Sequence, residues 1–204
     1  MLIAPFDANM NCAVNAQSGR EAEREIRPAS ARKRVLVVGG GPAGMEAARV
    51  AALRGHEVRL GERGARLGGS LFYASVVHEG NQRLLDYLLG ELGRLPVRVE
   101  LGRALEPAQC TGADAVVVAT GAAVLRPVIP GMEATHVYDA TAVRGWFAGT
   151  ASPEELLRWP ALLRLLGRHV MPRVQPWLRP QHVRAASRHF LPLGRRVCVI
   201  GSDL

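Results

Sequence analysis

The stretch that decides the fold is Val35-Leu36-Val37-Val38-Gly39-Gly40-Gly41-Pro42-Ala43-Gly44. It opens with four consecutive apolar residues, a run typical of a strand buried on both faces of a parallel sheet. Proline is tolerated at the first position of a helix and the following residues are rich in alanine, so we predict a helix over 42–54 that ends at Gly55. A second predicted strand over 56–60 completes a strand–helix–strand unit with a right-handed crossover.

The glycines of this stretch match the pattern G-x-G-x-x-G of dinucleotide-binding loops. In that pattern Gly39 turns the chain, Gly41 lets the backbone approach a pyrophosphate, and Gly44 permits close packing of the helix on the strand. The helix N-terminus directs free N–H groups and the positive end of its dipole at the same point. The predicted phosphate-binding residues are therefore Gly39, Gly40, Gly41, Pro42, Ala43 and Gly44.

Glu62 follows the second predicted strand, where dinucleotide-binding units carry an acidic residue. Its carboxylate can accept hydrogen bonds from the adenosine ribose and would repel a 2′-phosphate, so the sequence favours FAD or NAD over NADP. Two interpretations of the neighbouring Arg63 stay open. It either packs on the adenine or a phosphate, or it is a solvated surface arginine.

Beyond this unit, hydrophobic patterns predict a helix over 81–95 and strands over 97–101 and 113–119. Prolines divide the arginine-rich stretch from Ser152 to Arg188 into two or three short helices. We expect an α/β, Rossmann-like domain with a central parallel sheet, plus a helical basic segment. The predicted parts are an arm or linker at 1–31, a dinucleotide-binding domain at 32–148, a helical insertion at 149–192 and the start of a second nucleotide-binding domain at 193–204.

Composition restricts the class of protein. The hydrophobic share of 48% fits a folded globule, and no apolar run reaches the roughly 20 residues that a spanning helix needs. The first ten residues lack the pattern of a signal peptide, so we expect a cytoplasmic protein with reduced thiols at its three cysteines. The net charge of +8 is compatible with several anionic partners and selects none of them.

Five segments, in their order and spacing, resemble the FAD-binding domain of the pyridine nucleotide-disulphide oxidoreductase superfamily. They are Val35–Gly44, Glu62, Arg66–Gly69, Asp114–Gly121 and Pro127–Gly131. The resemblance implies FAD as the cofactor of residues 32–148 and an NAD(P)H-binding domain starting, truncated, at 193–204. It also places further residues beside the dinucleotide, namely Gly68, Gly69, Ala119, Thr120 and Gly121.

Residues 11–15 and 19–21 look like the link that precedes this domain in the group of 2,4-dienoyl-CoA reductase, 2-enoate reductase and trimethylamine dehydrogenase. That group implies an N-terminal barrel with FMN and a four-iron (4Fe-4S) cluster, whose last ligand corresponds to Cys12. One thiolate cannot hold such a cluster, so we expect no metal site within this chain. Gly61 stands where the family carries a larger residue, and 149–192 is longer than the usual connection.

Three functions follow from these features. The first is an oxidoreductase domain whose FAD takes hydride from NAD(P)H and relays electrons toward an FMN and iron–sulphur partner domain. The second is a non-catalytic module that binds ADP or a dinucleotide. The third and weakest is a basic surface at 152–190 that binds anionic membrane or nucleic acid. The spacing of His169, His182 and His189 is too irregular for a metal site.

Overall fold

The computed structural model describes Cys12, residues 14–122, residues 128–189 and residues 197–198. The predicted second nucleotide-binding domain therefore lies almost wholly outside the described residues, as does Pro127. The described residues form a four-stranded sheet in the order β3-β2-β1-β4, in which all neighbours are parallel. This confirms the predicted α/β class with a central parallel sheet. The strands are β1 Arg34–Val38, β2 Glu57–Glu62, β3 Val97–Leu101 and β4 Ala115–Val118.

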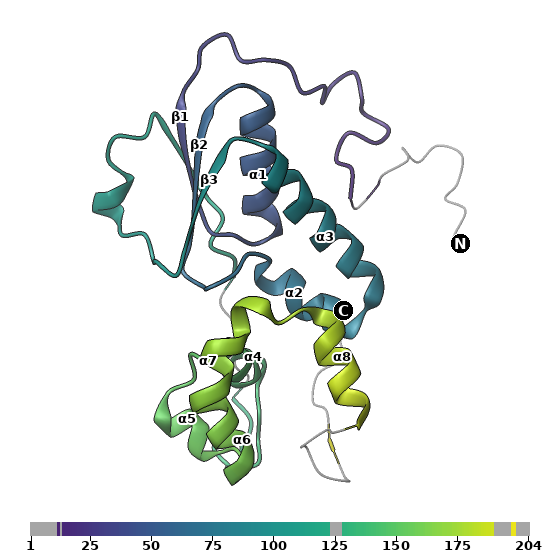
Figure 1. The fold of residues 1–204 in the computed structure, drawn as a ribbon, viewed down its shortest axis with the longest axis vertical. Helices are drawn as coiled ribbons and strands as arrows, with labels where there is room; N and C mark the ends of the chain where they lie inside the picture. The colour runs from purple at the N-terminus through teal and green to yellow at the C-terminus, as the bar shows by residue number, and fades with distance from the viewer. Residues whose placement is uncertain (1–11, 13, 123–127, 190–196, 199–204) are drawn as a thin grey trace.

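Two helices, α1 and α3, pack beside the sheet, and a group of shorter helices forms a second lobe at the carboxyl ends of the strands (Figure 1). Short 3-10 turns occur at Pro107–Cys110 and Gln175–Trp177, and a π-helical turn occurs at Leu166–Val170. The helices are α1 Pro42–Leu53, α2 Gly69–Val77, α3 Glu79–Arg94, α4 Ala140–Ala148, α5 Pro153–Leu157, α6 Ala161–Leu165, α7 Met171–Val174 and α8 Pro180–His189.

The main core lies between the sheet and the helices α1 and α3. Val37 and Leu60 of the sheet and Met45 of α1 have no exposed surface. Helix α3 adds a buried stripe, and its members are Leu85, Leu88 and Leu92. These three leucines share one face because they are three and four residues apart, whereas Leu89 points away and is 38% exposed. Truncating any one of the three to alanine would cost about 2–5 kcal/mol.

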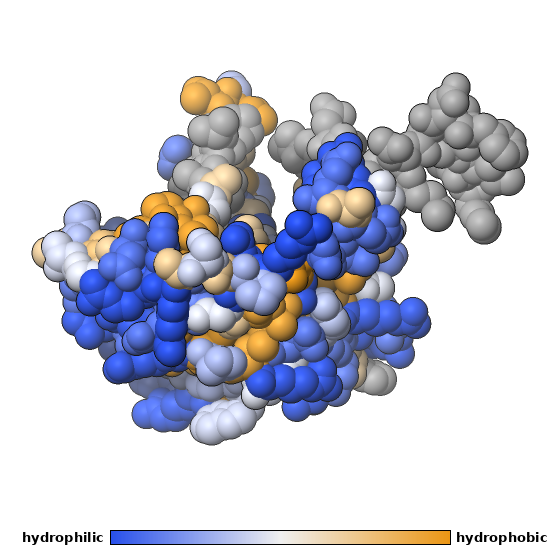
Figure 2. Space-filling model, turned by 90° about the horizontal axis from the view of Figure 1, so that it is seen from above, coloured by the Kyte–Doolittle hydropathy of each residue, from blue (hydrophilic) through white to orange (hydrophobic). Residues whose placement is uncertain are grey.

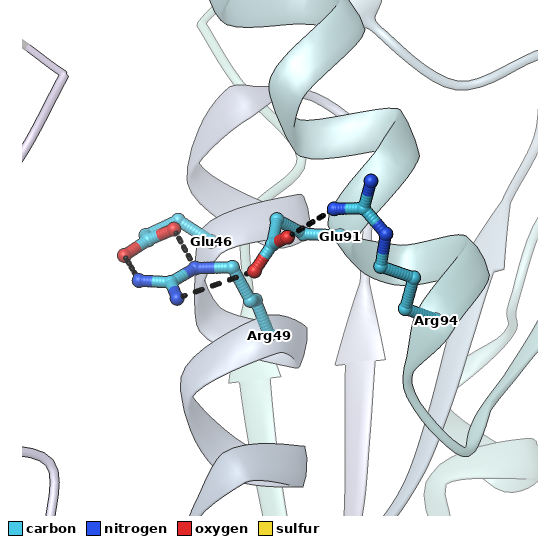
Figure 3. Close-up of polar contacts among 4 residues, drawn as sticks. All are labelled: Glu46, Arg49, Glu91 and Arg94. Atoms are coloured by element: carbon cyan, nitrogen blue, oxygen red, sulfur yellow. Dashed lines mark hydrogen bonds and ion pairs between the residues drawn. The ribbon is translucent and has the colours of Figure 1, made fainter.

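A charged network ties α1 to α3 on the outer side of this core (Figure 3). Arg49 donates two hydrogen bonds of 2.8 Å to Glu46, one turn earlier in α1. The same guanidinium lies 3.9 Å from Glu91 of α3, which accepts a 2.9 Å bond from Arg94. The hydrogen bonds to Glu46 raise the pKa of Arg49, whose side chain is only 13% exposed. The link of this network between α1 and α3 is the 3.9 Å ion pair of Arg49 with Glu91, and the shorter bonds within each helix hold these two side chains in place.

The second lobe has its own aromatic core. The rings of Trp146 and Trp159 lie 5.7 Å apart, and Tyr138 packs on Trp159 at 4.6 Å between ring centroids. Trp146 donates its indole N–H to the carbonyl of Leu163 at 2.8 Å. Helix α4, which precedes the predicted boundary at residue 149, thus packs together with the helices that follow it.

Helix α8 returns from this lobe to the main core. Its Val183 is 8% exposed and belongs to the same buried cluster as the sheet residues. Arg184 donates to the carbonyl of Ser75 at the end of α2 and, at 2.7 Å, to the Gln82 amide oxygen of α3. Helix α8 is consequently anchored on α2, α3 and the main core.

Two features of the fold were not expected from the sequence. Helix α2 forms at Gly69–Val77, a stretch for which the sequence analysis predicts no helix. Strand β4 pairs with β1 alone among the described strands, and its Val116, Val117 and Val118 are 41%, 37% and 73% exposed. The apolar run of β4 therefore lies at an edge of the described sheet.

Most of the surface seen from above is hydrophilic, with an apolar band near its middle (Figure 2). Within the described ranges, every helix is too short or too polar to cross a membrane.

Candidate dinucleotide-binding site

The first glycine loop joins β1 to α1 and leaves no room for side chains at its two ends. Gly39 has a φ of +109°, and a Cβ there would overlap the carbonyl of Ala119. A Cβ at Gly44 would overlap the carbonyl oxygen of Gly39 and lie 3.0 Å from its carbonyl carbon. The helix consequently approaches the strand so closely that only glycine fits at these two positions.

Gly41 has the opposite surroundings. No heavy atom lies within 4 Å of the position that a Cβ would take, and its φ of −74° is open to any residue. Nothing in the fold itself therefore requires glycine here. Because Gly41 is the N-cap of α1, the space beside it faces N–H groups of the first helical turn, which have no partner within the helix. Such a space suits an anion that contacts the backbone directly.

A second glycine loop meets the first one. Gly68 donates its N–H to the carbonyl of Gly40 at 2.8 Å, and a Cβ at Gly69 would lie 3.0 Å from the Cα of Gly41. Both residues of this second loop have positive φ values, +115° and +50°. Since Gly69 also begins α2, the N-termini of α1 and α2 lie side by side, and the positive ends of both dipoles converge on one place.

Glu62 lies at the end of β2 and faces the first loop. Its Oε2 accepts the N–H of Gly40 at 2.7 Å, and its Oε1 accepts the N–H of Gly64 at 2.6 Å. A carboxylate offers about four lone-pair positions, so each oxygen keeps capacity for a ligand hydroxyl. Arg63 beside it is exposed, and no hydrogen bond or ion pair joins its side chain to the described residues. Both interpretations of Arg63 remain open.

The third predicted segment borders the same loop only at its beginning. Ala119 donates its N–H to the carbonyl of Val38 at 2.8 Å, and its own carbonyl lies against Gly39. Thr120 and Gly121 are exposed, and Gly121 has a φ of +81°. Ala119 and the backbone nitrogen of Thr120 are thus the parts of this segment that contact the first glycine loop.

Arg66 precedes the second loop, but its side chain is engaged with the protein. The guanidinium lies 3.4 Å from the centroid of the Phe72 ring and donates to the carbonyl of Gln175 at 3.4 Å. Burial lowers the pKa of Arg66 from its usual value. This arginine therefore braces α2 against the helical lobe, and the glycines that follow it are the part of the motif that faces Gly41.

An open hollow of about 660 Å³ begins where the two glycine loops meet. Pro42 and Ser70, at the starts of α1 and α2, form its near end. One face of α2 and one face of α4 form its walls. The lining residues are Pro42, Ser70, Leu71, Tyr73, Ala74, Val77, Asn81, Tyr138, Asp139, Ala140, Val143 and Arg144. Sequence reasoning missed this hollow, because Tyr73 and Arg144 belong to no motif and are brought together only by the fold.

No iron–sulphur or other metal site fits the described part of the chain. No group of three or more histidine, cysteine, aspartate or glutamate side chains comes together there. Cys12 is exposed, and hydrogen bonds from the backbone N–H groups of Asn15 and then Val14 lower the pKa of its thiol. A single thiolate does not make a cluster site. Gly61, which departs from the family pattern, packs against Leu105, whose side chain takes the space of a Cβ.

The sequence profile of one family, described as pyridine nucleotide-disulphide oxidoreductase, matches residues 13–86 and 33–153. Among curated proteins, the chain is 44% identical over 138 residues to a bilirubin reductase of Mediterraneibacter gnavus, covering 66% of this chain and 22% of the relative. It is 42% identical over 140 residues to a cinnamate reductase of Clostridium sporogenes, covering 67% of this chain and 21% of the relative. The chain thus spans about a fifth of the length of these relatives.

A solved structure of 2-naphthoyl-CoA reductase in complex with 2-naphthoyl-CoA matches with a TM-score of 0.63 and 32% identity. The match covers 68% of this chain and again 22% of the other chain. The family profile is the comparison that includes both glycine loops, because its matched ranges cover residues 39–44 and 68–69.

Proposed function

The chain belongs to the pyridine nucleotide-disulphide oxidoreductase family, and from this premise we propose that it is the FAD-binding part of a flavin-dependent NAD(P)H oxidoreductase. One observation carries the proposal: two glycine loops meet at the adjacent N-termini of α1 and α2 and leave open space beside Gly41. That arrangement suits two linked phosphates. Relatives named as reductases support the redox class.

In this proposal each residue has a role that its position allows. The backbone around Gly41 and Gly69 binds the pyrophosphate, and the helix termini stabilise its charge. Glu62 accepts hydrogen bonds from the adenosine ribose hydroxyls while its bonds to Gly40 and Gly64 hold its orientation. The same negative charge disfavours a 2′-phosphate at this place. Ala119, Thr120 and Gly121 border the nucleotide on the side of β4.

Bound FAD supplies the ability to accept a hydride and to pass its electrons on. The chain contributes binding, orientation and the electrostatic surroundings of the cofactor. In the full-length protein we propose a relay from NAD(P)H through this FAD toward an FMN and iron–sulphur domain. The basis is the resemblance to the enoate-reductase group, together with relatives about five times longer than the matched unit. In this proposal the cluster and the FMN site belong to that other domain.

The proposal is tested by identifying the small molecule that copurifies with the chain. The protein is purified without added cofactor, its absorbance is recorded, and a heat extract is analysed by mass spectrometry. FAD with flavin absorbance is the expected result. A colourless protein that releases ADP would instead support a non-catalytic nucleotide module. A chain that takes up neither added FAD nor added ADP would contradict both functions.

A further inference from the structure

The hollow between α2 and α4 has a regular construction. On α2, the lining residues Ser70, Tyr73, Ala74 and Val77 are spaced three and four apart, so they form one helical face. On α4, Ala140, Val143 and Arg144 have the same spacing. Two helix faces thus oppose each other across the hollow. Ala74 and Val77 on α2 and Ala140 and Val143 on α4 leave a space that suits a flat ring, and polar side chains of Ser70, Tyr73 and Arg144 lie on the same two faces.

The position of the hollow decides which part of FAD it suits. It starts at Pro42 and Ser70, beside the phosphate-binding loops, and Glu62 is not among its lining residues. The region around Glu62, which we assign to adenosine, and the hollow are therefore separate, and the glycine loops assigned to the pyrophosphate lie between them. A dinucleotide whose ribose reaches Glu62 has its other half available to enter the hollow. The flavin ring is that half.

Arg144 is the cation of this hollow, and Tyr73 fixes its position. The Arg144 guanidinium carbon lies 5.4 Å from the centroid of the Tyr73 ring, and the Tyr73 hydroxyl donates to the Arg144 carbonyl at 3.3 Å. Within the described part of the chain, no carboxylate lies within ion-pairing distance of the guanidinium. Asp139, which also lines the hollow, caps α4 by accepting the N–H of Ala142 at 2.7 Å. Arg144 is half-buried, so water screens its charge less than that of a surface arginine.

We propose that Arg144 is a positioning residue that stabilises the negative charge of the reduced flavin ring between α2 and α4. This inference rests on the proposed function, because it requires FAD in the hollow. Uptake of a hydride from NAD(P)H adds two electrons and one proton to the oxidised ring, and NAD(P)+ leaves. The reduced ring consequently carries one net negative charge at neutral pH. A fixed cation beside it favours the reduced state over the neutral oxidised state.

The test compares the affinity of the chain for oxidised FAD with its affinity for dithionite-reduced FAD. Arg144→Met removes the charge and keeps most of the side-chain length. It should weaken binding of reduced FAD on the order of tenfold more than binding of oxidised FAD, as expected for one charge near a half-exposed site. Arg144→Lys keeps the charge and should therefore bind reduced FAD, relative to oxidised FAD, nearly as well as the unaltered chain does. A residue that only braced the fold would lower both affinities equally.

Arg54→Met serves as the matched control. Arg54 follows the last residue of α1, at the opposite end of that helix from Pro42, so the substitution removes the same charge far from the hollow. For Arg54→Met we expect the ratio of the affinity for reduced FAD to the affinity for oxidised FAD to equal that of the unaltered chain. If the unaltered chain binds no FAD, the proposed function fails and this inference fails with it. If FAD binds but Arg144→Met leaves the ratio unchanged, only the inference is overturned.

Discussion

Replacement of Gly41 by valine should weaken FAD binding by several orders of magnitude while leaving the fold intact. The backbone there has a φ of −74°, which any residue adopts, and apart from its chain neighbours no heavy atom lies within 4 Å of the position of a Cβ, so the Cβ of the new side chain enters open space. Loss of glycine at a helix N-cap costs at most about 1 kcal/mol here. The valine would instead occupy the space of the pyrophosphate. Losing two charge-assisted hydrogen bonds at about 1.5–3 kcal/mol each lowers affinity by roughly 10²- to 10⁴-fold.

The assay measures two quantities on the same preparation. Thermal or urea unfolding reports stability, and titration of the apoprotein with FAD, followed by flavin fluorescence, reports affinity. Two further glycines calibrate the result. Gly90 lies at an exposed position of α3, and a Cβ there would meet no atom of another part of the chain within 4 Å. The Gly90→Ala variant should therefore be more stable than the unaltered chain by up to about 1 kcal/mol, because alanine has the higher helix propensity. The Gly44→Ala variant should be less stable than the unaltered chain by about 1–3 kcal/mol or more, because the new Cβ overlaps the Gly39 carbonyl.

The outcome that refutes this reasoning is specific. If Gly41→Val bound FAD as tightly as the unaltered chain, the pyrophosphate would not lie against this loop, and the assigned site would be wrong. If Gly44→Ala were as stable as the unaltered chain, the close approach of α1 to β1 would be wrong instead. The two variants therefore test the binding role and the structural role of the motif separately.

Two other predictions concern the frame around the site. Hydrogen bonds from Arg34 hold the pKa of the Asp114 carboxyl at about 2, below its ordinary value of 3.8. This pair therefore stabilises the fold above pH 3.8, and its contribution is lost as the pH falls through about 2. Asp114→Asn should accordingly be less stable than the unaltered chain at neutral pH, and urea unfolding at decreasing pH should show the difference vanish near pH 2. Arg184→Met should destabilise the docking of α8 by about 1–3 kcal/mol, because the carbonyl of Ser75 and the amide of Gln82 lose their donor. Faster limited proteolysis of this helix would accompany the change, and unaltered protection would contradict it.

The elements that the sequence predicted well depend on local chemistry. The run Val35–Val38 followed by glycines and Pro42 allows one backbone path, since proline opens a helix and glycine alone adopts the turn. The leucine spacing of α3 likewise specifies which side faces the core. Helix α2 escaped prediction because Gly69–Val77 starts with glycine and is rich in aromatic and β-branched residues, which have modest helix propensity. Its burial against α3 and α8 compensates.

The sequence by itself therefore determined the glycine loops, the acidic residue beside them and the succession of β1, α1 and β2, because these depend on backbone conformation and on neighbours within a few residues. Only the tertiary structure decided that Arg66 braces the helical lobe and that Tyr73 and Arg144, 71 residues apart, share one hollow. Contacts of that kind arise from the packing of α2 against segments far along the chain, and no local pattern encodes which side chains such packing brings together.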